Sequence, residues 1–211
     1  MTAFLLALAS LFPIMNPFAA LPVFGELTAD MERGARNRTA LTAALAVLAI
    51  LVVSTLGGRF LLQGLGVSLP ALQIAGGIVV GLTAIGMVTG RAAQLHPEEK
   101  QDSATRSSVG VVPMAMPLIA GPGAISVVIA AAGKAAGDWI AIGAICLAAL
   151  VMSALVYLVL RFGEVLLARL GATGLGVLTR IFGLVILAIA VELVTDGLGT
   201  LFPVLDRSTG S

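Results

Sequence analysis

The chain alternates long apolar runs with short charged connections. Six stretches contain no Asp, Glu, Lys or Arg: 1–25, 39–58, 60–90, 107–133, 139–160 and 181–191. A membrane-spanning helix needs about 20 largely apolar residues, so five of these runs are long enough by themselves. The sixth reaches that length if the helix continues to residue 202 and includes Glu192 and Asp196. The pattern therefore predicts an all-α membrane protein with six transmembrane helices.

Composition agrees with this prediction. Apolar residues make up 59% of the 211 residues, charged residues make up 11%, and the mean hydropathy is +1.09. Soluble domains have about a quarter of their residues charged. The net charge of +1 gives no basic surface for phosphates, so we expect no nucleic-acid partner. The single Cys146 and single His96 provide neither a zinc site nor a Cys–His nucleophile. We therefore expect no metal, no cofactor and no enzymatic activity.

The positions of the basic residues predict the orientation in the membrane. The connections after the first, third and fifth predicted helices hold nine Lys and Arg residues, and the opposite set holds three. Because cytoplasmic loops carry an excess of Lys and Arg, both termini are predicted to lie outside. The nine are Arg33, Arg36, Arg38, Arg91, Lys100, Arg106, Arg161, Arg169 and Arg180, and the three are Arg59, Lys134 and Arg207.

Two pairs of similar segments indicate an internal repeat. Pro17 aligns with Pro122 at an offset of 105 residues, and LQIAG at 72–76 aligns with TRIFG at 179–183 at an offset of 107. Each half would hold three helices, and an odd number makes the second copy enter the membrane from the opposite side. This inverted repeat is typical of many secondary transporters, although apolar sequence also aligns with itself by chance. The predicted units are a first repeat, a cytoplasmic connection, a second repeat and a short polar tail, at 1–90, 91–106, 107–205 and 206–211.

Two of the predicted helices are interrupted near the middle of the membrane. Pro suits the first position of a helix, and Asn or Gly suits the cap before it, so each interruption reads as the start of a half-helix. The free backbone N–H groups there would offer donors and a positive dipole end to a carboxylate. A pair of proline kinks is the alternative, as is a re-entrant hairpin. The candidate substrate-binding residues are Asn16, Pro17, Phe18 and Ala19 in the first helix, and Gly121, Pro122, Gly123, Ala124 and Ser126 in the fourth.

Three further residues are candidates for weaker reasons. Gly76 and Gly77 form a small-residue face, which either lets two helices approach closely or borders a site for a small substrate. Glu192 is a carboxylate with long apolar flanks, and acids inside a membrane often serve proton or sodium coupling. An interfacial position for Glu192 is the alternative, because the repeat alignment places it near the outer end of a helix.

The motifs resemble the MarC family of bacterial and archaeal inner-membrane proteins. The resemblance is carried by NPFAALPVF at 16–24, ALQIAGGIVVGLTAIGM at 71–87, VVPMAMPLIAGPGAIS at 111–126 and RIFGLVILAIAVELVTDG at 180–197. It spans nearly the whole chain and implies six helices and kinship with the LysE-type transporter superfamily. It also implies a multi-pass location in the cytoplasmic (inner) membrane of a bacterium or archaeon, and some relatives move small neutral amino acids. The family often has Gln where this chain has Glu192.

Sequence and resemblance together predict a secondary transporter of small neutral amino acids, such as glycine or alanine, coupled to a proton or sodium gradient. The two half-helix starts would hold the substrate carboxylate while the two three-helix bundles rock around it. The expected partners are this small-molecule substrate, the lipid bilayer and the coupling ion, with a homo-oligomer left open. The alternatives are efflux of drugs or metabolites, for which eight Phe, one Trp and one Tyr are few, and a non-transporting membrane scaffold.

Overall fold

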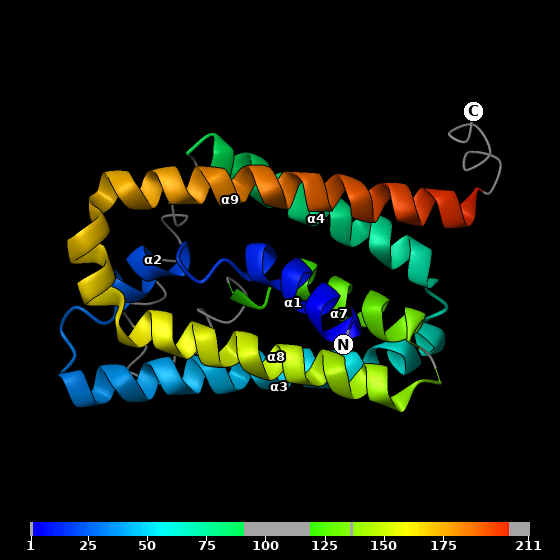
Figure 1. Ribbon diagram of the computed structural model, residues 1–211, viewed down its shortest axis with the longest axis horizontal. Helices are drawn as coiled ribbons and strands as arrows, with labels where there is room; N and C mark the ends of the chain where they lie inside the picture. The colour runs from blue at the N-terminus through cyan, green and yellow to red at the C-terminus, as the bar shows by residue number, and fades with distance from the viewer. Residues whose placement is uncertain (1, 91–118, 136, 203–211) are drawn as a thin grey trace.

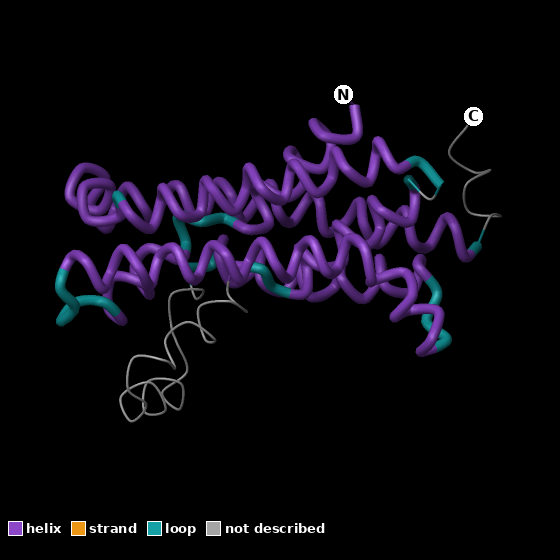
Figure 2. The backbone as a smooth tube through the Cα atoms, turned by 90° about the horizontal axis from the view of Figure 1, so that it is seen from below, coloured by secondary structure: helices purple, strands orange, loops and turns teal. Residues whose placement is uncertain are grey.

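The architecture is entirely helical within the residues that the computed structural model describes, 2–90, 119–135 and 137–202. Seven helices and no strand occur in these ranges (Figures 1 and 2). The helices are α1 (Thr2–Met15), α2 (Ala20–Leu27), α3 (Arg33–Leu65), α4 (Leu69–Val88), α7 (Pro122–Lys134), α8 (Trp139–Arg161) and α9 (Gly163–Leu201). The prediction of an all-α protein is confirmed for this part of the chain. The predicted connection at 91–106 and the predicted tail at 206–211 lie outside the described residues.

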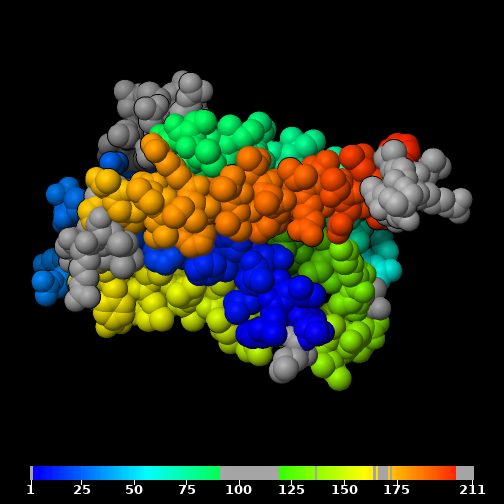
Figure 3. Space-filling view, turned by 45° about the horizontal axis from the view of Figure 1, so that its top comes forward, coloured from blue at the N-terminus to red at the C-terminus, as the bar shows by residue number. Residues whose placement is uncertain are grey.

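The helices pack in three layers. Helix α4 lies along α9 on one side of the molecule, and α3 lies along α8 on the other (Figure 1). The shorter helices α1, α2 and α7 lie between these two pairs. Figure 3 shows α1 in blue, seated between α9 in orange and α8 in yellow. The interrupted segments therefore lie between two pairs of long helices.

Four helices are long and apolar enough to cross a membrane: α3, α4, α8 and the Thr173–Leu201 part of α9. Helices α1 and α2 together make a fifth candidate that is bent by 56° at the break between them. Helix α7 has 13 residues and is about 20 Å long at 1.5 Å per residue, which is shorter than the hydrocarbon core of a bilayer. The count of six spans is not confirmed, since the residues before 119 that would complete the fourth span are not described.

Local signals explain where several helices begin and end. The Ser68 hydroxyl accepts a hydrogen bond from the Ala71 N–H at 3.3 Å and caps α4. The Asp138 carboxylate accepts from the N–H groups of Ile140 and Ala141 and caps α8 in the same way. Helix α3 ends at Gly66, whose φ of 68° is in the left-handed region that glycine adopts without a side-chain clash.

The predicted loop after the fifth helix is wrong, because most of that segment is helical. Helix α9 begins at Gly163, is interrupted at Gly171 with φ 63° and ψ 174°, and continues to Leu201. Arg180 therefore lies within the helical Thr173–Leu201 segment, a candidate membrane span, and is exposed on its surface. A long arginine side chain can bury its stem along an apolar helix while the guanidinium reaches toward water. A single Arg consequently does not end a helix.

Close backbone approach holds α4 against α9. A Cβ atom added to Gly77 would lie 2.8 Å from the Ala190 carbonyl oxygen, and one added to Gly197 would lie 2.8 Å from the Pro70 carbonyl oxygen. At these distances no side chain fits, so both glycines serve as contact points between the two helices. The predicted helix-packing role of Gly77 is what the structure displays.

Candidate functional site

The break between α1 and α2 is built around Asn16. The Asn16 N–H donates to the Phe12 carbonyl at 3.2 Å and closes the last turn of α1. The Asn16 carbonyl then accepts from the Ala19 N–H at 3.0 Å. Asn16 has φ 28°, and it is the one non-glycine residue with positive φ in the described part of the chain. Asn tolerates this conformation better than most residues, so the turn is local to this residue and the following Pro17.

The expectation of free N–H groups at Phe18 and Ala19 is therefore only partly met. The Ala19 N–H is occupied by the Asn16 carbonyl, and α2 begins one residue later, at Ala20. The left-handed Asn16 makes a turn in which its own carbonyl faces the Ala19 donor. The Phe18 ring stacks on the Phe182 ring of α9 at 5.9 Å between centroids, which fixes the break against the long outer helix.

The Asn16 side chain is buried without a partner. Its exposed fraction is 4%, and neither Oδ1 nor Nδ2 has a hydrogen-bond partner among the described residues. A buried polar group left unpaired costs about 1–3 kcal/mol. Such groups are rare in folded proteins and call for a specific explanation. The Asn16 amide offers one acceptor and two donors inside the central layer, which makes it a candidate ligand-binding group.

The start of α7 matches its sequence prediction. Gly121 is the N-cap with φ −64° and ψ 176°, and Pro122 occupies the first helical position. The N–H groups of Gly123 and Ala124 have no hydrogen-bond partner within the described residues, as expected for the first turn of a helix. This helix start is where the structure supplies the donors that the sequence predicted.

Ser126, Gly76 and Gly123 lie at the contact between α4 and α7. The Ser126 hydroxyl donates to the Pro122 carbonyl at 2.8 Å, within its own helix. A Cβ atom on Gly76 would overlap the Ser126 side chain, and one on Gly123 would overlap Val80. The missing side chains therefore let α4 and α7 touch.

Two cavities lie near these contacts. The smaller, of about 170 Å³, surrounds the start of α7 and is lined mainly by apolar side chains. The larger, of about 610 Å³, lies among α1, α4, α7, α8 and α9, and its size suits a small-molecule site. The smaller cavity contains four predicted residues, Gly121, Pro122, Gly123 and Ala124. Glu192 lines the larger one.

The structure does not gather all the predicted residues at one point. The four residues Asn16, Pro17, Phe18 and Ala19 line neither of these two cavities. Gly76, Gly77 and Ser126 belong to helix contacts.

Sequence reasoning missed the polar residues of the larger cavity other than Glu192. Among them are Gln73 on α4, Lys134 on α7 and Asp196 on α9. Gln73 is a polar side chain inside an apolar run, which is a signal that could have singled it out. Lys134 was expected in a connection between spans and Asp196 inside the sixth span, and neither was assigned to a site. For Glu192, the structure shows an exposed carboxylate at the cavity wall.

Several long apolar helices in one chain define a multi-pass integral membrane protein. The family model described as "MarC family integral membrane protein" matches residues 1–202, and the chain belongs to this family.

Similar proteins are found in archaea and bacteria. A UPF0056 membrane protein of Methanocaldococcus jannaschii is 37% identical over 198 residues, covering 92% of this chain and 95% of that protein. The UPF0056 membrane protein YhcE of Escherichia coli is 39% identical over 198 residues, covering 92% and 90%. The UPF0056 membrane protein YvbG of Bacillus subtilis is 31% identical over 200 residues, covering 93% and 94%. No solved structure matches the chain.

Proposed function

We propose that this protein is a secondary transporter of small neutral amino acids of the glycine or alanine type, coupled to a proton or sodium gradient. The observation that carries the proposal is the buried, unpartnered Asn16 amide at a helix break in the central layer. Irregular backbone at membrane depth is tolerated where it is buried in protein or lines a cavity. Interrupted helices of this kind form the substrate sites of many secondary transporters.

The packing supports an inverted repeat of two three-helix units. In the proposed alignment, α3 corresponds to α8 and α4 to α9, while the bent α1–α2 pair corresponds to α7 and the residues before it. The two pairs of equivalent helices lie side by side, α3 with α8 and α4 with α9 (Figure 1). Such pairing is compatible with a two-fold relation between the units.

The proposed transport cycle uses the two interrupted segments and the larger cavity. The N–H groups at the start of α7 and the Asn16 amide bind the carboxylate end of the substrate, and the aliphatic surround admits a small side chain. The larger cavity, which contains Thr2 near the start of α1 and Asp196 near the end of α9, is the proposed entrance for the substrate. With both termini outside the cytoplasmic membrane, as proposed from the basic residues, this cavity faces the exterior.

Uptake by reconstituted protein tests the proposal. Purified protein in proteoliposomes is given radiolabelled glycine or alanine under an imposed proton or sodium gradient, in separate runs. Gradient-dependent uptake that is lost in Asn16→Leu is the expected result. Ser153→Ala is the matched control, because the Ser153 hydroxyl on α8 is also buried without a partner but lies outside the proposed site. Absence of uptake under either gradient by folded, inserted protein would overturn the proposal.

A further inference from the structure

The larger cavity carries more negative than positive charge. Three carboxylates line it, Asp138, Glu192 and Asp196, together with one ammonium, Lys134. The cavity also lies next to apolar walls from α1, α7 and α8. A cleft of one dominant sign between low-dielectric walls raises the local concentration of the opposite charge. The electrostatics of this cavity therefore favour a cation.

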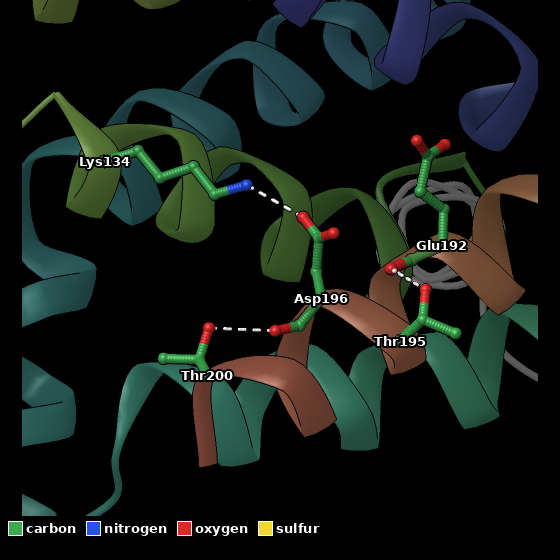
Figure 4. Close-up of polar contacts among 5 residues, drawn as sticks. All are labelled: Lys134, Glu192, Thr195, Asp196 and Thr200. Atoms are coloured by element: carbon green, nitrogen blue, oxygen red, sulfur yellow. Dashed lines mark hydrogen bonds and ion pairs between the residues drawn. The ribbon is translucent and has the colours of Figure 1, made fainter. Parts of the chain in front are cut away.

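One ammonium already occupies part of the cavity. Lys134, the last residue of α7, places Nζ 2.9 Å from Asp196 Oδ2 on α9 (Figure 4). The two side chains are 65% and 48% exposed. Exposed ion pairs of this kind contribute about 0–1 kcal/mol, so the contact opens readily. It shows that a primary ammonium fits against this wall of α9.

Glu192 presents a second carboxylate beside the first. It lies one helical turn before Asp196 on α9, and the two carboxylates project from the same side of the helix (Figure 4). The Glu192 carboxylate has no hydrogen-bond or ion-pair partner in the described part of the chain. Asp138 differs, because its carboxylate accepts from two backbone N–H groups and caps α8.

Gln73 is an independent sign that the cavity takes a ligand. Its exposed fraction is 4%, and its side chain lines the same cavity from α4. It has no hydrogen-bond partner among the residues described. Unlike those of Asn16, its amide atoms are not fully buried, so a molecule in the cavity can reach them. Its amide oxygen supplies an uncharged acceptor in the cavity that the carboxylates of α9 also line, and an ammonium, with three donors and no acceptor, matches that set.

We infer that the larger cavity binds a primary ammonium group, the amino end of the transported substrate, with Glu192 and Gln73 accepting its hydrogen bonds. The Lys134 ammonium competes with the ligand, because it pairs with the neighbouring Asp196 carboxylate while the site is empty. The inference rests on the proposed function for the identity of the ligand and adds where the amino end of that ligand docks. The assignment is to this chain's own side chains and does not involve the helix breaks.

Direct binding tests the ammonium site without transport. Ethylammonium chloride and, separately, sodium propionate and sodium chloride are titrated into the purified full-length protein in detergent by calorimetry. Ethylammonium carries the ammonium without the carboxylate, and propionate carries the reverse. Folding of each variant is checked by gel filtration and thermal unfolding.

Two variants are expected to shift ethylammonium affinity in opposite directions. Glu192→Gln replaces a charge-assisted hydrogen bond by a neutral one and weakens binding about tenfold. Lys134→Met frees Asp196 and tightens binding by up to about fivefold; misfolding cannot produce a gain of this kind. The matched control Asp138→Asn removes a cavity charge while keeping a good cap, and leaves the affinity within about twofold of wild type.

Three results would overturn the inference. The first is equal ethylammonium affinity in wild type, Glu192→Gln and Lys134→Met. The second is a loss of ethylammonium affinity in Asp138→Asn as large as that in Glu192→Gln, because binding would then depend only on the net charge of the cavity. In the third, sodium chloride binds more weakly to Glu192→Gln and more tightly to Lys134→Met while ethylammonium binding does not change, which assigns the cavity to a metal cation.

Alanine uptake separates this inference from the proposed function. Glu192→Gln is expected to raise KM for alanine about tenfold with kcat unchanged. Alanine uptake by wild type with an unchanged KM in Glu192→Gln would refute the ammonium site but not the proposed transport function. Ethylammonium binding with the expected affinities in the variants, but no alanine uptake, would refute the proposed transport function but not the ammonium site.

Discussion

Replacing Asn16 by Gly is expected to make the protein more stable and less active. The change removes a buried amide whose two polar atoms have no partner among the described residues, a burial that costs about 1–3 kcal/mol. It also relieves the φ of 28°, which glycine adopts freely. Against this, glycine loses about 0.5–1 kcal/mol through the greater freedom of the unfolded chain, and the packing of the side chain is lost. A net gain of about 1 kcal/mol remains.

The assay is thermal unfolding of the purified protein, run beside alanine uptake in proteoliposomes. For a chain of this size, 1 kcal/mol corresponds to a rise in Tm of about 2–4 °C. The matched control is Asn37→Gly within α3, where Gly has the lower helix propensity and Tm falls. A lower Tm for Asn16→Gly with uptake retained would refute the reasoning, because the amide would then be structural.

Three further predictions concern packing and capping. Gly77→Ala is expected to lower Tm below that of Gly81→Ala by several degrees, which corresponds to about 1–3 kcal/mol of stability. A Cβ atom at Gly77 lies 2.8 Å from the Ala190 carbonyl oxygen, whereas one at Gly81 lies 3.6 Å from the Ala190 Cβ atom. Equal Tm values for the two variants would contradict the prediction. Ser153→Ala should raise Tm, because a buried hydroxyl without a partner costs about 1 kcal/mol or more; a fall in Tm would show that the hydroxyl is paired. Asp138→Ala should lose about 1 kcal/mol of capping energy that Asp138→Asn retains, measured as a lower Tm for the Ala variant alone.

The fold was predictable where local signals and long apolar runs coincide. The run at 139–160 became α8 at Trp139–Arg161, because Asp138 caps its start and a charge stands at its end. The segment 163–180 was missed because its scattered charges read as a loop, whereas the helix continues through them with one interruption at Gly171. Charge alone does not break a helix; the backbone of a residue such as Gly171 does.

The candidate site was predictable only in its local parts. Gly121 and Pro122 start α7 as their cap and first-turn preferences indicate. At the other break, the left-handed conformation of Asn16 uses the Ala19 donor that was expected to be free. The larger cavity depends on how five helices pack together, which brings the Lys134 side chain to Asp196, 62 residues away. No pattern in one sequence reports such packing.

The glycine contacts between α4 and α9 carry an evolutionary consequence. At Gly77, Gly183 and Gly197, an added methyl group would come within about 3 Å of atoms of the opposite helix, including backbone atoms that cannot rotate away. A replacement at any of the three forces atoms of the facing helix to shift, unless the facing helix changes as well. Variation along this seam should therefore come as paired, compensating replacements, while the lipid-facing sides of the same two helices remain free to exchange one apolar residue for another.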